Sequence, residues 1–149
     1  MALITRITRL FQSDLHAVLD NIEEPLILLK QAIREMQESM DTDKQQRILI
    51  QYQQSQLASQ QQDLKHSLQQ MEEELDICFA SAKDDLARGL IKRKLAAQRR
   101  EKLLDRKYNT LINNLAELNS RLDENQSRLT SMQQKADILA EHNTTNSAM

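Results

Sequence analysis

Apolar residues recur at alternating spacings of three and four along most of this chain. From Ile22 to Cys78, 17 positions follow the spacing, and 13 of them are apolar when the cysteine is counted. A repeat sustained over about eight heptads is typical of a helix that buries one side in a coiled coil. The four polar positions destabilise the seam, but they can fix its register or mark a flexible segment. These four are Asp43, Arg47, Gln54 and Gln61.

The repeat resumes at Leu90 and continues to Leu139. Its weakest part is the stretch 91–102, next to Gly89, which costs about 1 kcal/mol relative to Ala inside a helix. The predicted seam positions of this second arm are Leu90, Lys94, Ala97, Glu101, Leu104, Tyr108, Leu111, Leu115, Leu118, Leu122, Asn125, Leu129, Met132, Ala136 and Leu139.

The stretch 79–85 separates the two repeats, and we interpret it as the tip of a helical hairpin. Ser81 with Asp84 three residues later resembles a capping box, in which a Ser side chain caps free N–H groups and acidic groups favour the helix start. The sequence therefore predicts an all-α fold, a long antiparallel coiled-coil hairpin. Its arms are residues 22–80 and 81–141, and residues 142–149 are expected to form a frayed tail.

Residues 1–20 form a separate amphipathic helix in this interpretation. Leu3, Ile4, Ile7, Leu10 and Phe11 share one face, and Arg6 and Arg9 lie on the other. Such a helix can lie in a bilayer interface, or it can pack on its own hairpin or on a neighbouring subunit. Pro25 then marks a new helix start, where its missing N–H is tolerated.

Composition supports long helices and argues against a sheet or a compact globule. The 149 residues include one Gly and one Pro, so few turns can form, and aromatic residues make up only 3%. Eleven glutamines in residues 45–70 are best interpreted as a polar helix face, since the apolar repeat continues through them. The single cysteine, Cys78, cannot form an internal disulfide and falls on the seam. We expect a cytoplasmic protein because no apolar run approaches the roughly 20 residues of a membrane span.

A basic stretch follows the predicted tip, and an acidic run precedes it. The acidic run is Glu72, Glu73, Glu74 and Asp76. Three interpretations remain open: charge pairing within the hairpin or between subunits, contact with anionic lipid headgroups, and nucleic-acid binding. Nucleic acid is the least expected, because only Tyr108 is near for stacking. The basic residues are Lys92, Arg93, Lys94, Arg99, Arg100, Lys102, Arg106 and Lys107.

The chain offers little chemistry for catalysis. His16, His66 and His142 are far apart and lack metal-ligand spacing. One glycine cannot build a phosphate-binding loop, and two long helices offer no desolvated pocket in which carboxyl groups become acids or bases. We therefore expect no catalytic residues, no metal and no cofactor.

Three stretches resemble the phage shock protein A family, which includes the plastid vesicle-inducing proteins and belongs to the ESCRT-III-like superfamily. They are the start Ala2-Leu3-Ile4-Thr5-Arg6-Ile7, the junction Glu23-Glu24-Pro25 with the following Ile33-Arg34-Glu35-Met36, and Asp84-Asp85-Leu86-Ala87-Arg88 beyond the tip. The order and spacing of these stretches cover roughly residues 1–140.

The resemblance implies a peripheral protein on the inner face of the cytoplasmic membrane that acts in envelope stress. Its N-terminal helix would bind anionic lipids, and its hairpin would self-associate to protect or remodel the membrane. The rival implication is an adaptor that binds an AAA+ transcription activator. The membrane-binding residues carried over are Leu3, Ile4, Arg6, Ile7, Arg9, Leu10 and Phe11.

The sequence departs from the family pattern in three places. Glu24 stands where an Asp is usual, which makes a weaker cap, and Gly89 stands where an Ala is usual. Typical members also continue past the hairpin with helices that close the polymer lattice. We therefore expect assembly to differ from that of typical members.

Overall fold

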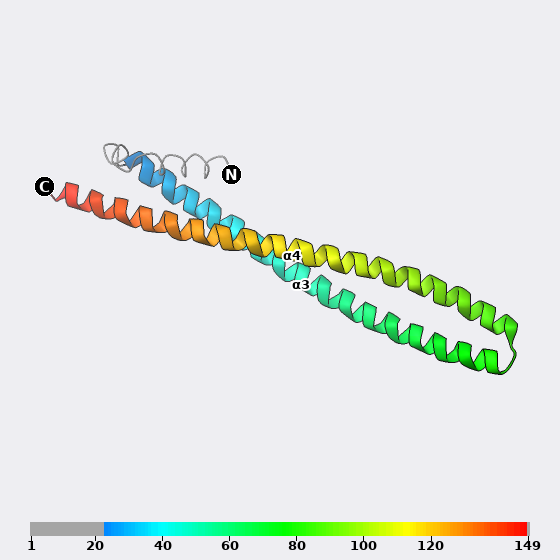
Figure 1. Cartoon of the computed structure of the whole chain (residues 1–149). Coiled ribbons are helices and arrows are strands. Elements are labelled where there is room, and N and C mark those ends of the chain that lie inside the picture. Colours follow the sequence, from blue (N-terminus) through cyan, green and yellow to red (C-terminus); the bar gives the residue numbers. More distant parts are fainter. Residues whose placement is uncertain (1–22, 149) are drawn as a thin grey trace. The chain divides into compact units, whose positions relative to one another are not determined.

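Two long helices make up the part of the chain that the computed structural model describes, residues 23–148. Helix α3 spans Glu23–Ala80 and helix α4 spans Asp84–Ser147, with three residues between them. The described residues contain no strand. The two helices are antiparallel and pack against each other (Figure 1). The predicted all-α hairpin is thus confirmed, whereas the predicted helix over residues 1–20 lies outside the described residues.

The seam predicted from the apolar repeat is the contact surface between the helices. All 16 predicted positions of α3 that the structure describes, and all 15 of α4, are buried or half-buried. Leu29, Met36 and Leu139 are almost completely buried. The repeat did not include Ala32, which is also fully buried although it lies one residue outside the spacing.

The hairpin divides into two compact units, which we describe separately. The base unit contains residues 23–46 and 118–148 of the described chain, and the tip unit contains residues 47–117. The base unit holds most of the fully buried side chains, including Leu29, Ala32 and Met36. In the tip unit only Ile50, Leu75, Cys78, Ala87 and Leu104 are buried. Apolar packing is therefore sparser along the tip unit.

Helix α4 runs farther than the sequence indicated. Residues 142–149 were expected to be a frayed tail, but the helix continues to Ser147. The end of the apolar repeat marked only the point where α4 stops packing against α3. Backbone N–H to C=O bonds four residues apart need no apolar side chain, and the segment contains no Gly or Pro to interrupt them.

Candidate interaction surfaces

The turn between the helices is built differently from the predicted capping box. The N–H of Lys83 donates to the carbonyl of Cys78 at 3.0 Å, and the N–H of Ala82 donates to that of Phe79 at 3.3 Å. Ala82 has a φ of 53°, in the left-handed region. This combination is a Schellman motif, which ends a helix. Ser81 therefore belongs to the end of α3 and does not cap α4.

Helix α4 begins with Lys83 as its cap residue, because the carbonyl of Lys83 accepts the first helical bond, from Ala87 at 3.1 Å. Asp84 and Asp85 occupy the first turn. Their negative charges are favourable at the positive end of the helix dipole. The predicted acidic start of α4 is confirmed, but the predicted Ser cap is wrong. The sequence signal was misleading because a non-glycine residue, Ala82, occupies the left-handed position.

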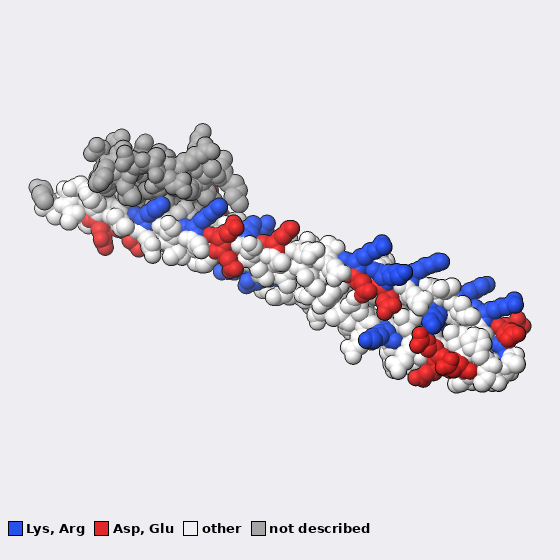
Figure 2. All heavy atoms as spheres, in the orientation of Figure 1, with Lys and Arg blue, Asp and Glu red and all other residues white. Residues whose placement is uncertain are grey.

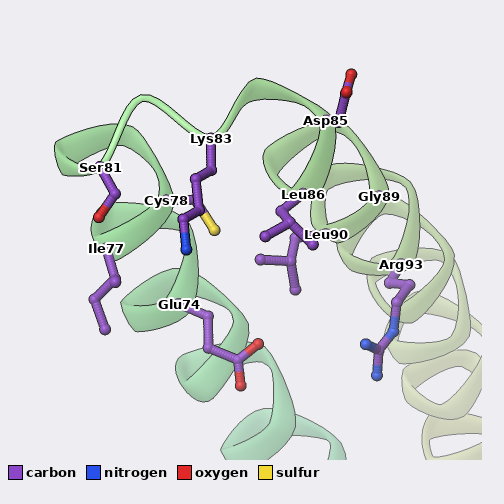
Figure 3. A pocket seen from close by; sticks show the side chains of 10 residues that line it. All are labelled: Glu74, Ile77, Cys78, Ser81, Lys83, Asp85, Leu86, Gly89, Leu90 and Arg93. Carbon is purple, nitrogen blue, oxygen red and sulfur yellow. The ribbon is translucent and has the colours of Figure 1, made fainter.

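An open groove with a volume of about 530 Å³ lies beside this turn. Figure 3 shows Leu86 and Leu90 projecting from α4 toward α3, across from Cys78. The thiol is free and buried, in a small cluster with Leu75 and Ala87. Large apolar side chains nevertheless remain exposed here, 66% for Ile77, 60% for Phe79 and 58% for Leu86. Glu74, Lys83, Asp85 and Arg93 also line the groove, which is therefore apolar with charged edges.

The basic residues singled out in the sequence do not form one surface. Lys94 lies on the seam, and its Nζ pairs with Oε1 of Glu72 at 3.1 Å. Lys92 and Arg99 are exposed on the side of α4 that faces away from α3, whereas Arg93 and Arg100 lie on its flank. Charge pairing within the hairpin, one of the three open interpretations, thus accounts for Lys94 alone among these five residues.

Three polar residues on the α3 seam have partners on α4, whereas the buried amide nitrogen of Asn125 on the α4 seam has none among the described residues. In the tip unit, Nε2 of Gln61 donates to Oδ1 of Asp105 at 2.7 Å, and Nε2 of Gln54 donates to the hydroxyl of Tyr108 at 3.4 Å. In the base unit, Arg121 donates two hydrogen bonds to the buried carboxylate of Asp43. The sequence marked Asp43, Gln54 and Gln61 but not Arg121, which lies one residue outside the repeat.

Two further observations concern possible binding chemistry. Within residues 23–148, no three His, Cys, Asp or Glu side chains are placed to hold a metal ion. No helix in this part of the chain is long and apolar enough to cross a membrane. The residues predicted to bind the membrane, Leu3, Ile4, Arg6, Ile7, Arg9, Leu10 and Phe11, lie outside the described residues.

These features define a coiled-coil hairpin protein whose candidate interaction surfaces are helix faces and a tip. A model of the PspA/IM30 family matches residues 2–149, so the chain belongs to the PspA/IM30 family. This is a non-enzymatic, membrane-associated stress-response family whose members self-associate. The comparison with curated proteins found no match.

Proposed function

We propose that this protein self-associates on the inner face of the cytoplasmic membrane and protects or remodels that membrane under envelope stress. Family membership supports the membrane and assembly parts of this function. The structural observation that carries the proposal is the apolar surface left uncovered by the hairpin. Thirteen large apolar side chains are exposed on residues 23–148. Clusters of them, such as Ile48, Leu49 and Tyr52 on α3, are typical of surfaces that bind a partner or a bilayer.

The proposed membrane anchor is the amphipathic segment 2–19. In this arrangement Leu3, Ile4, Ile7, Leu10 and Phe11 enter the interface between headgroups and acyl chains. Arg6 and Arg9 bind anionic headgroups from the polar face. Binding strength then grows with the apolar area buried and with the attraction between the arginines and anionic lipid.

Co-sedimentation with anionic liposomes tests this anchor. We expect the full chain to pellet with vesicles and a form lacking residues 1–20 to stay in the supernatant. Ile7→Glu should abolish binding while circular dichroism stays strongly helical. Gln12→Glu is the matched control, since it adds the same charge on the polar face and should retain most of the binding. Equal binding by Ile7→Glu and the wild type would exclude the proposed membrane role of residues 2–19.

The same experiment examines the basic stretch as a lipid contact. If the form lacking residues 1–20 still pellets, the anionic contact is better assigned to Lys92, Arg93, Lys94, Arg99 and Arg100. Of these, Lys94 is the least suited, because it is already paired with Glu72.

A second candidate function is that of an adaptor that binds a protein partner such as an AAA+ transcription activator. The observation that favours it is the apolar groove at the tip, with Ile77, Phe79 and Leu86 exposed around it. Calorimetric titration of the purified activator domain with the full chain tests this function. Phe79→Asp should weaken the complex, whereas Ile138→Asp, an equally exposed apolar site in the base unit, should not. Absence of any heat of binding with the wild-type chain at two temperatures would exclude this candidate, because burial of apolar surface changes the heat capacity and cannot be silent at both.

A further inference from the structure

Helix α4 carries a straight cationic stripe along the outer face of the tip unit. Six exposed residues recur at spacings of four and three on the side opposite the seam, and five of them are cations. Figure 2 shows blue side chains along the α4 edge of this half of the hairpin. The sixth residue is Leu95, which is 49% exposed. The cationic stripe consists of Arg88, Lys92, Leu95, Arg99, Lys102 and Arg106.

Helix α3 carries an acidic face on the opposite side of the same unit. Asp63, Glu73 and Asp76 are exposed and point away from α4, and Glu72 and Glu74 lie on either side of Glu73. Figure 2 shows red side chains gathered along the α3 edge near the tip. Ile77, which is 66% exposed, adjoins Asp76 on this face. The acidic charges of this face thus gather at residues 72–76 beside an exposed aliphatic side chain, and Asp63 stands apart from them beyond the exposed Lys65 and His66.

The two surfaces lie at the same level along the hairpin. Glu72 contacts Lys94 and Gln61 contacts Asp105, which fixes the alignment of the two helices in this unit. By that alignment Asp76 lies level with about residue 90 and Asp63 with about residue 103, at a rise of about 1.5 Å per residue. The acidic face therefore lies within the length of the cationic stripe.

These charges cannot neutralise one another within one hairpin. They lie on opposite sides of it, and no carboxylate of residues 23–148 forms an ion pair with a cation of the stripe. Like charges four residues apart on one helix repel each other. Apart from Glu72, which pairs with Lys94, the residues of the two surfaces therefore form no ion pair within residues 23–148 of the isolated chain.

We propose that the acidic face of one copy binds the cationic stripe of a second copy. This inference deepens the self-association part of the proposed function and rests on it. Opposite charges at matching levels favour a second copy over a lipid surface, which would bind the cations and leave the acidic face unpaired. Leu95 of one copy and Ile77 of the next supply apolar contact between the ion pairs.

The contact is heterologous, because two different surfaces of the same chain meet. Because the two surfaces are on opposite sides of the tip unit, an array of any length still has an unbound cationic stripe at one end and an unbound acidic face at the other. Such contacts do not close on themselves in a dimer, so they build open-ended side-by-side arrays. Because the ion pairs are exposed, added salt should weaken the arrays.

Two charge-reversed variants of the full chain test the proposal. Lys92→Glu with Arg99→Glu lowers the charge of the stripe from +5 to +1, and Glu73→Lys with Asp76→Lys lowers the charge of the acidic face from −5 to −1. None of the four residues lies on the seam, so circular dichroism should be unchanged. In sedimentation velocity, in lipid-free buffer at low salt, the wild type should form large assemblies. Each variant should need at least a tenfold higher protein concentration to assemble.

The decisive measurement is an equimolar mixture of the two variants. The acidic face retained by the first variant matches the stripe retained by the second, whereas the two altered surfaces carry little net charge. We therefore expect the mixture to assemble into 1:1 complexes although neither variant does so alone. Lys30→Glu with Arg34→Glu, the same charge change on exposed residues of the base unit, is the control and should assemble like the wild type.

Three results would overturn the proposal. They are a monomeric wild type, variants that assemble as well as the wild type, and a mixture that fails to assemble. If Lys92→Glu with Arg99→Glu assembles normally but loses binding to phosphatidylglycerol vesicles, the stripe is a lipid contact instead. The sedimentation measurements contain no lipid, so their failure leaves the membrane anchor of residues 2–19 to be judged by the liposome experiment alone.

Discussion

Arg121 on α4 holds the buried carboxylate of Asp43 on α3 through two hydrogen bonds. Its Nε donates to Oδ2 at 2.9 Å and its Nη2 donates to Oδ1 at 2.7 Å. The Asp43 side chain is 10% exposed and that of Arg121 is 51% exposed. The carboxylate therefore stands inside an apolar seam, and the guanidinium reaches it from the solvent side. Such a bidentate pair adds geometric specificity to the energy of the contact.

Removing the guanidinium should destabilise the hairpin more than removing both charges. Arg121→Met leaves the Asp43 carboxylate buried without a partner, which should lower the free energy of unfolding by about 2 kcal/mol. The double variant Asp43→Leu with Arg121→Met should be as stable as the wild type or more so, because apolar side chains of similar size often replace a buried pair without loss. Urea unfolding followed by circular dichroism measures both. Equal losses in the single and the double variant would show that the pair does not act as a unit.

Glycine at the left-handed position of the turn should stabilise the chain. Ala82 has a φ of 53°, which an L side chain adopts at a cost of about 1–2 kcal/mol. Ala82→Gly removes that cost but makes the unfolded chain more flexible, so the expected net gain is about 0.5–1 kcal/mol. Thermal unfolding should show a higher midpoint. Ala58→Gly, at an exposed position inside α3, should instead lower it; a lower midpoint for Ala82→Gly would argue against the turn geometry.

Gly89 lies inside α4 without a packing reason for being glycine. A Cβ built on it meets nothing within 4 Å, and the backbone is helical. Gly89→Ala should therefore raise the free energy of unfolding by about 1 kcal/mol. Ala96→Gly, one heptad later at the same exposed position, should lower it by a similar amount. A loss of stability for Gly89→Ala in urea titrations would contradict the helical backbone and the open space at this position.

Packing in the base unit should depend on seam residues and not on their exposed neighbours. Leu29 is completely buried, and Leu29→Ala should cost about 2–4 kcal/mol through lost burial and the cavity that remains. Ile27 is 65% exposed, and Ile27→Ala should change the stability by less than about 0.5 kcal/mol. Unfolding of the two variants in guanidinium chloride, analysed with a common m value, measures this contrast. Similar costs at both sites would mean that Ile27 is covered in the folded protein.

The alternation of three and four was enough to predict the seam. Every described position that it selected is buried or half-buried, down to polar residues such as Asp43 and Gln61. It missed Ala32, which lies one residue off the spacing, because a helix buries a strip wider than two positions per heptad. It also missed Arg121, whose half-exposed side chain reaches Asp43 from the edge of the seam. It also ended α4 too early, since periodicity reports packing and not backbone hydrogen bonding.

The candidate surfaces were less predictable from local patterns. Ser81 and Asp84 fit a helix start, yet Ser81 follows the last turn of α3, because the chain ends that helix with Ala82 in a conformation that the sequence alone disfavours. The basic stretch was visible as a list of cations. Only the position of each cation around α4 separated Lys94, which is paired on the seam, from Lys92 and Arg99, which lie on the outer stripe.

By itself the sequence determined the fold, because a heptad repeat with one break leaves an antiparallel hairpin as the simplest way to bury both apolar strips. It also carried the family resemblance that the family model then confirmed. The tertiary structure decided which residues are partners across the hairpin and which charges remain unpaired. That information depends on how the two helices are aligned with each other, as Glu72 with Lys94 and Asp43 with Arg121 show. Spacing within one helix cannot supply it.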